Sequence, residues 1–204
     1  MSGSTNFFIT GWDHIVDINA YDHVLFVMAL CAAYRLVQWR QIVIIITAFT
    51  LGHSGTLILC AIDVIPTNPT LVDLLIPFTI MVTALLNVAR DNHEAGGTDT
   101  KLKYGAALGF GLIHGLAFAN NFKVILFEDS ILMPLLLFNL GIEVGQIFIV
   151  ILLMGALWVY NKYLSGDHAK WNLFLSGACF GVATILMIEA LKPAENMPAN
   201  VLPF

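Results

Sequence analysis

Long apolar stretches separated by short polar connections are the feature that most constrains this chain. A transmembrane helix needs about 20 mostly apolar residues, and six segments have this character: residues 20–37, 42–64, 71–89, 102–119, 131–160 and 172–191. Residues 42–46 are all isoleucine or valine, which in a soluble protein would indicate a strand, but the apolar stretch continues too far for one. The pattern predicts an all-α integral membrane protein with six transmembrane helices.

The composition excludes several other classes of protein. Hydrophobic residues make up 58% of the chain and charged residues 11%, whereas the surface of a soluble domain needs roughly 25–35% charged residues. The net charge of −5 and the lack of a basic patch argue against a nucleic-acid partner. The expected partners are the lipid bilayer and a bound ion, with a homo-oligomer as an open alternative.

The segment before the first predicted span differs from the rest. Residues 7–18 are too short to cross a bilayer and include Asp13, His14 and Asp17, so they predict a short interfacial or re-entrant helix. The first six residues contain no lysine or arginine, so we expect no cleaved secretory signal. The expected organisation is an N-terminal interfacial segment (1–19), a transmembrane domain (20–191) and a C-terminal tail (192–204).

The basic residues predict the orientation of the spans. Two of the nine, Lys123 and Lys192, lie on one side, and seven lie on the other: Arg35, Arg40, Arg90, Lys101, Lys103, Lys162 and Lys170. Cytoplasmic loops carry the excess of lysine and arginine. We therefore expect a multi-pass protein of the cell inner (plasma) membrane with both termini on the outer, periplasmic or extracellular, side.

Five ionisable side chains fall inside the predicted spans. They are Asp22, His23, His53, His114 and Glu143. Each costs at least about 2.5–3.5 kcal/mol at mid-bilayer on the insertion scale, which makes such residues functional candidates. In the predicted topology they lie between the outer surface and the middle of the bilayer, with Asp22 and His23 near the surface. Three imidazoles and two carboxylates are the composition of a divalent transition-metal site.

Other polar residues are placed to support such a site. Ser54 lies beside His53, and Asn139 and Gln146 flank Glu143 at helical spacing, so we expect them to orient the ligands through hydrogen bonds. His14 is expected to be the first ligand met by an ion arriving from outside. The simpler alternative for any one of these residues is a hydrogen bond between two helices.

Four phrases in the chain resemble those of the HupE/UreJ family of small polytopic membrane proteins. They are residues 13–15 with 21–26 (Asp-His-Ile and Tyr-Asp-His-Val-Leu-Phe), 49–57 (Phe-Thr-Leu-Gly-His-Ser-Gly-Thr-Leu), 111–119 (Gly-Leu-Ile-His-Gly-Leu-Ala-Phe-Ala) and 138–146 (Phe-Asn-Leu-Gly-Ile-Glu-Val-Gly-Gln). The chain resembles a divergent branch, because seven residues instead of five separate His14 from Asp22 and no glutamate follows His114-Gly115.

The resemblance implies a nickel or cobalt permease, or an accessory protein of metalloenzyme maturation. It also implies that Asp22, His23, His53, His114 and Glu143 handle the metal ion, with Ni²⁺ favoured and Co²⁺ or Zn²⁺ as alternatives. A second hypothesis is an intramembrane zinc-dependent hydrolase acting on a lipid-like amide or ester, with Asp22, Ser54 and Glu143 as catalytic groups. A third hypothesis is a metal sensor or assembly factor.

Overall fold

The computed structural model of the protein describes residues 6–17, 21–66, 68–89, 98–125, 132–164 and 166–192. For residues 98–100, 120, 121 and 123–125 it describes the backbone alone. All regular elements in these ranges are helical. In chain order they are α1 (Phe7–Val16), α2 (Tyr21–Ala32), the 3₁₀ helix η2 (Leu36–Gln38), α3 (Trp39–Ala61), α4 (Pro69–Ala89), α5 (Thr98–Ile125), α6 (Leu132–Tyr163) and α7 (His168–Ala190).

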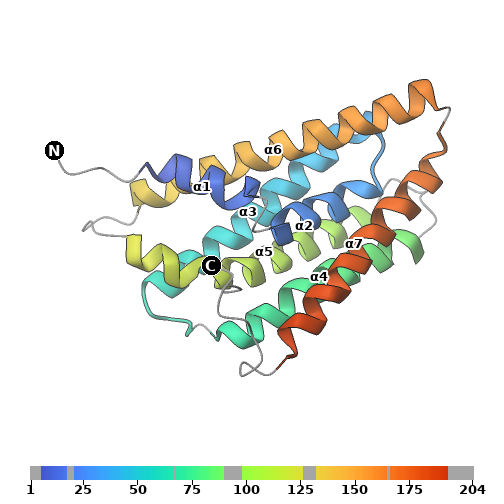
Figure 1. Cartoon of the computed structure of the whole chain (residues 1–204). Coiled ribbons are helices and arrows are strands. Elements are labelled where there is room, and N and C mark those ends of the chain that lie inside the picture. The colour runs from blue at the N-terminus through green and yellow to red at the C-terminus, as the bar shows by residue number, and fades with distance from the viewer. Residues whose placement is uncertain are drawn as a thin grey trace.

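The helices form a bundle that matches the expected membrane fold. Five helical segments, α3 with η2 and then α4, α5, α6 and α7, are long and apolar enough to cross a membrane, and the bent pair α1 and α2 brings the number to six when it is counted as one broken span. Helices α1, α4 and α6 begin at the end of the bundle where α3, α5 and α7 end (left and lower left in Figure 1). Large apolar side chains are exposed along the outside, as on Phe78, Ile151 and Phe174, which suits contact with lipid. The prediction of an all-α membrane protein is confirmed.

One end of the bundle collects basic residues. We call it the basic end, and within the described residues it carries Arg35, Arg40, Lys101, Lys103, Lys162 and Lys170. Helices α5 and α7 extend farther toward this end than expected from hydropathy, because they start at Thr98 and His168 instead of residues 102 and 172. Their first turns are polar and continue the helix beyond the apolar stretch.

The first predicted span is where the structure differs most from the expectation. Residues 20–37 do not form one helix, because α2 ends at Ala32. Its twelve residues rise about 18 Å, well short of the roughly 30 Å hydrocarbon core. Helix α1 supplies the remaining length, at an angle of 69° to α2. Asp22 and His23 therefore begin the second half of a broken span instead of lying at the outer surface.

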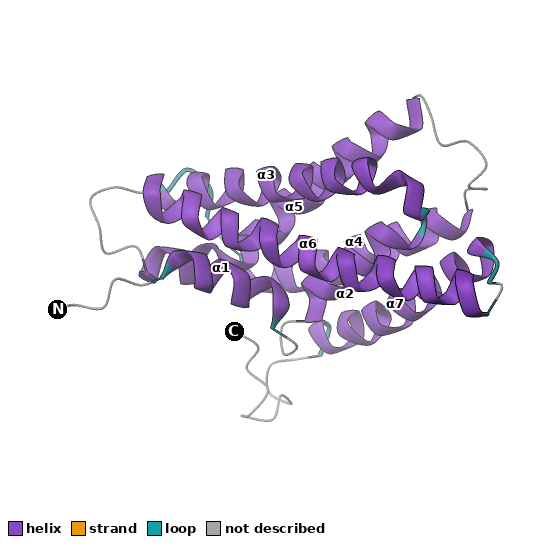
Figure 2. Ribbon diagram, turned by 90° about the horizontal axis from the view of Figure 1, so that it is seen from above, coloured by secondary structure: helices purple, strands orange, loops and turns teal. Residues whose placement is uncertain are grey.

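Helix α1 packs against the first half of α6 (Figures 1 and 2). Glycines allow the close approach, since a Cβ at Gly11 would overlap the Phe138 carbonyl oxygen and one at Gly141 the Phe8 carbonyl oxygen. The helix ends at Asp17, whose backbone is extended. Helix α1 thus packs along α6 as the first arm of the bent α1–α2 pair.

Helices α3 and α5 form the most extensive helix pair of the bundle. A Cβ at Gly52 would overlap the Leu108 carbonyl oxygen, and one at Gly111 would overlap the Phe49 carbonyl oxygen. Small residues at such positions let helix backbones touch inside a membrane. This contact fixes α3 and α5 in register with each other.

Candidate metal site

Five ionisable side chains from four helices meet beside the break between α1 and α2. We call them the histidine cluster: His14 of α1, Asp22 and His23 of α2, His53 of α3 and His114 of α5. The ring centroid of His23 lies 4.5 Å from that of His14 and 5.4 Å from that of His114, and the centroids of His14 and His53 are 5.6 Å apart. His53 and His114 are fully buried.

The histidine cluster contains two sets of candidate ligands that share His23. One ligand atom each from His14, His23 and His53 lie within 4.8 Å of one another, and so do one each from Asp22, His23 and His114. Two nitrogens bound about 2.1 Å from one ion lie at most about 4.2 Å apart. Small side-chain rotations would therefore close either set around a cation.

The imidazole nitrogens of the cluster are short of hydrogen-bond partners. Five of them are buried without any: Nε2 of His14, Nε2 of His23, both nitrogens of His53 and Nδ1 of His114. Buried polar atoms are normally paired, and each unpaired one costs about 1–3 kcal/mol. These atoms belong to four imidazoles, each of which carries one lone pair when neutral, and a bound cation would take up such lone pairs.

The hydrogen bonds around His114 fix which of its nitrogens is available. Thr79 Oγ1 donates its single hydrogen to the Ile76 carbonyl oxygen at 2.7 Å. The 3.2 Å contact between Thr79 Oγ1 and His114 Nε2 is then made by the imidazole N–H donating to Thr79. Nδ1 keeps the lone pair, and it is the nitrogen that has no partner. A metal-ligating histidine is commonly oriented in this way through its other nitrogen.

His23 is oriented by its neighbour on α2. Its Nδ1 lies 3.1 Å from Asp22 Oδ1, and an ionised carboxylate can only accept a hydrogen bond. His23 therefore donates from Nδ1 and keeps a lone pair on Nε2, which is buried without a partner. In this arrangement Asp22 orients a ligand, and the pair matches the carboxylate–histidine–metal triads of known metal sites.

Aromatic rings enclose the cluster and keep it dry. Phe118 packs on His14 with ring centroids 4.2 Å apart, and Phe138 lies 6.3 Å from His53. An apolar shell of this kind limits the access of water to a metal site.

Two further rings, from Phe26 and Phe49, lie 4.8 and 5.2 Å from His114. The sequence reasoning did not single them out. Phe26 follows His23 by three residues and Phe49 precedes His53 by four, so each shares a helix face with a cluster residue. That spacing is the signal that could have identified them.

The structure places the other predicted site residues outside the cluster. Glu143 of α6 accepts a hydrogen bond of 2.5 Å from Thr47 of α3 and belongs to neither set of candidate ligands. Ser54 donates to the Thr50 carbonyl oxygen of its own helix at 2.7 Å. Gln146 accepts a hydrogen bond from Thr50 Oγ1 at 2.9 Å, and Asn139 Oδ1 is buried without a partner. A ligand role for Glu143 stays a prediction that these contacts do not require.

Replacing Thr79 with valine tests the assignment of His114 Nδ1. Valine keeps the shape of threonine but removes the oxygen that holds the Nε2–H. We expect metal affinity to fall about tenfold, because partners of this kind typically contribute 10–100-fold. Titration calorimetry on purified protein would measure it. Thr83→Val is the matched control, since Thr83 bonds only the Thr79 carbonyl oxygen one turn away. Equal losses in both variants would contradict the assignment.

Comparison with known proteins places the chain in a family. The sequence profile described as HupE / UreJ protein matches residues 1–191, which include every helix of the bundle. Neither the search of curated proteins nor that of solved structures returned a significant match. The family is of the nickel/cobalt transporter or urease accessory type, and its profile covers both the broken first span and the helices that carry the histidine cluster. The chain is thus a multi-pass membrane protein of the HupE/UreJ family.

Proposed function

We propose that this protein is a permease for a divalent transition-metal ion, with Ni²⁺ or Co²⁺ as the cargo, and that the ion binds in the histidine cluster. The observation that carries the proposal is the group of five buried, unpartnered imidazole nitrogens. Imidazole suits nickel, cobalt and zinc, whereas calcium and magnesium prefer oxygen ligands. Within the cluster Asp22 supplies the one negative charge, which favours a cation.

The position of the cluster supports transport. Membrane transporters often bind substrate where a transmembrane helix is interrupted in the middle, and the α1–α2 break supplies such a place. The two ligand sets that share His23 give an ion two neighbouring stations, His14–His23–His53 and Asp22–His23–His114. Transfer between them exchanges ligands one at a time, which helps a site rich in imidazole to release its ion.

The orientation follows from the basic end. Cytoplasmic loops carry the excess of basic residues, so the basic end faces the cytoplasm, and α1 begins and α7 ends on the outer side. An ion arriving from outside then meets His14 in the half-helix α1. A membrane potential of 100 mV, negative inside, favours inward movement of a divalent ion by about 4.6 kcal/mol.

A zinc-dependent hydrolase is the second candidate function, because catalytic zinc sites also use three protein ligands and leave one position open. In such an enzyme Asp22 would act as the base. The structure offers less support for the remaining groups, since Ser54 and Glu143 are both engaged in hydrogen bonds away from the cluster.

Flux measurements on the purified protein in liposomes test the proposal. Wild-type protein is expected to admit Ni²⁺ to a trapped metal-sensitive dye, and His23→Ala to slow this flux at least tenfold because both ligand sets lose their shared member. Glu189→Gln is the control, since Glu189 is an exposed acid of α7 outside the cluster. Binding of Ni²⁺ without flux in the wild type would favour the sensor or assembly factor. Zinc-dependent cleavage of a lipid amide or ester would favour the hydrolase.

A further inference from the structure

A cavity lies next to the histidine cluster, between α2, α3, α4 and α5. Its volume is about 60 Å³, and since one water needs about 10–15 Å³ there is room for a few. The wall includes polar groups, among them Thr83 and Asn87 of α4, and also Ala106, Ala107 and Phe110 of α5. The cluster residues do not line it.

The cavity lies about one helical turn closer to the basic end than His114 and the residues that contact it. Each of four helices contributes a lining residue four positions, about 6 Å, from a residue beside or at His114: Leu30 after Phe26, Ile45 before Phe49, Thr83 after Thr79, and Phe110 before His114. In every case the step runs toward the basic end. Tyr34 and Lys103, the lining residues that stand nearest that end in sequence, lie beside each other, with the Lys103 ammonium 5.4 Å from the Tyr34 ring centroid.

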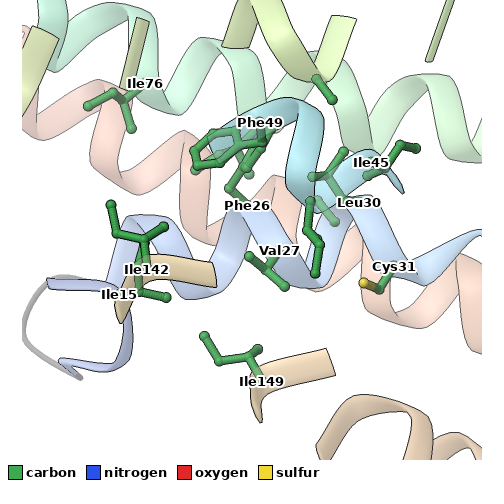
Figure 3. Close-up of a cluster of buried hydrophobic side chains, with 14 of the residues drawn as sticks. Ile15, Phe26, Val27, Leu30, Cys31, Ile45, Phe49, Ile76, Ile142 and Ile149 are labelled. Carbon is green, nitrogen blue, oxygen red and sulfur yellow. The ribbon is translucent and has the colours of Figure 1, made fainter. Parts of the chain in front are cut away.

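A layer of phenylalanine rings separates the cavity from the cluster. The Phe26 ring centroid lies 4.8 Å from that of His114 and 5.9 Å from that of Phe110, which lines the cavity. Phe49 completes the layer at 4.8 Å from Phe26. Figure 3 shows the Phe26 and Phe49 rings together, with Leu30 and Ile45 beyond them on the cavity side. Phe26 and Phe49 are 0% and 1% exposed, so both rings are fully packed between the cavity and the cluster.

The wall of the cavity is mostly apolar, and its few polar groups offer oxygen acceptors to a hydrated cation. Asn87 Nδ2 donates to the Ala29 carbonyl oxygen at 2.6 Å and to Ser176 Oγ at 3.3 Å. Both amide hydrogens are thereby used, and the amide oxygen is left as an acceptor. The Thr83 hydroxyl likewise donates to Thr79 and keeps its oxygen lone pairs. Oxygen acceptors can hold the waters that an ion regains after it leaves imidazole ligands.

We propose that this cavity is the water-filled exit vestibule of the permease, and that Phe26 with Phe49 and Phe110 forms the barrier between it and the histidine cluster. The inference rests on the proposed function. An apolar constriction stops ions by excluding water, and displacement of the Phe26 ring opens the way from Asp22–His23–His114 to the vestibule.

Filling the vestibule provides the first test. Ala106→Leu is expected to slow Ni²⁺ flux into liposomes at least tenfold while the dissociation constant for Ni²⁺ stays within about twofold of wild type, because the cluster is untouched. Ala156→Leu is the matched control on the lipid-exposed face of α6, with unchanged flux. Retained Ni²⁺ binding shows that the variants fold. Normal flux through Ala106→Leu would overturn the vestibule.

Cysteine labelling tests the vestibule without any transport assay. Ala106→Cys is expected to react with a charged, membrane-impermeant thiol reagent added from the basic end, because water reaches it there. Ala156→Cys, facing lipid, is expected to stay unlabelled. The native cysteines give little background, since Cys31, Cys60 and Cys179 are buried. An unreactive Ala106→Cys would overturn the water-filled vestibule.

A variant that opens the phenylalanine barrier provides the third test. Wild type is expected to exclude Mg²⁺, which prefers oxygen ligands. Phe26→Ala is expected to raise Ni²⁺ flux several-fold and to admit Mg²⁺, whereas replacing Phe122, an equally buried phenylalanine of α5, with alanine is expected to do neither. Unchanged flux and selectivity in Phe26→Ala would overturn the barrier.

If the wild type itself moves no Ni²⁺, the proposed function fails. If it moves Ni²⁺ while the vestibule and barrier variants behave as their controls, this inference alone fails.

Discussion

Replacing His53 with leucine is expected to lower Ni²⁺ affinity at least 100-fold and yet to leave the metal-free protein at least as stable as wild type. His53 is fully buried with both nitrogens unpartnered. Residues that hydrogen-bond to a metal ligand contribute about 10–100-fold to metal affinity. Loss of a ligand itself should therefore lower the affinity by at least as much. Leucine is apolar and of similar size, and removing an unpartnered buried group saves about 1–3 kcal/mol.

Titration calorimetry, elemental analysis and thermal unfolding of the metal-free protein in detergent would measure both parts of this prediction. His168→Ala is the matched control, because the Nε2 of His168 contacts the Tyr34 carbonyl oxygen away from the cluster, and we expect it to bind Ni²⁺ normally. A His53→Leu protein that unfolds more readily and binds Ni²⁺ as well as wild type would show that His53 is a structural residue.

Replacing Gly52 with alanine is expected to destabilise the whole bundle by about 3 kcal/mol or more, at the upper end of the overpacking penalties found in well-packed cores. The added Cβ would overlap the Leu108 carbonyl oxygen, and a backbone atom cannot move aside as a side chain can. Helices α3 and α5 would have to separate, and they carry His53 and His114. Thermal unfolding followed by circular dichroism would measure the loss.

Gly109→Ala on α5 is the matched control for Gly52→Ala. A Cβ at Gly109 meets no atom within 4 Å, and alanine favours a helix over glycine by up to about 1 kcal/mol. We therefore expect Gly109→Ala to be neutral or slightly stabilising. If both variants lost stability equally, the close approach of α3 and α5 would not be the cause.

Most of the fold could be predicted because transmembrane helices are a local consequence of hydropathy. Each long apolar stretch must satisfy its backbone hydrogen bonds internally once it is in lipid, which makes it a helix whatever its neighbours are. The helix ends were harder to predict, because polar first turns at Thr98 and His168 extend α5 and α7 beyond their apolar stretches. A separate short helix before the first span was expected, but the length of that span was wrong: residues 20–37 are apolar enough to form one full span, whereas α2 ends at Ala32.

The sequence could predict most of the residues of the candidate site, but it could not predict how they are arranged. Asp22, His23, His53 and His114 were selected because ionisable groups are costly in lipid, and the structure brings them together. His14 was expected nearer the outer surface, but α1 folds inward and places it among them. Glu143 satisfied the same sequence criterion, yet its carboxylate bonds Thr47 instead of joining a ligand set.

The sequence by itself determined that the chain is a bundle of membrane-crossing helices, which family phrases it carries and which few residues are too polar for lipid. These are local properties, since hydropathy and residue identity do not depend on distant contacts. Only the tertiary structure decided that α1 is a half-helix packed on α6, that His23 is shared by two ligand sets and that phenylalanine rings separate the cluster from a cavity. Those features depend on how closely helices approach, which glycine–backbone contacts between distant segments control.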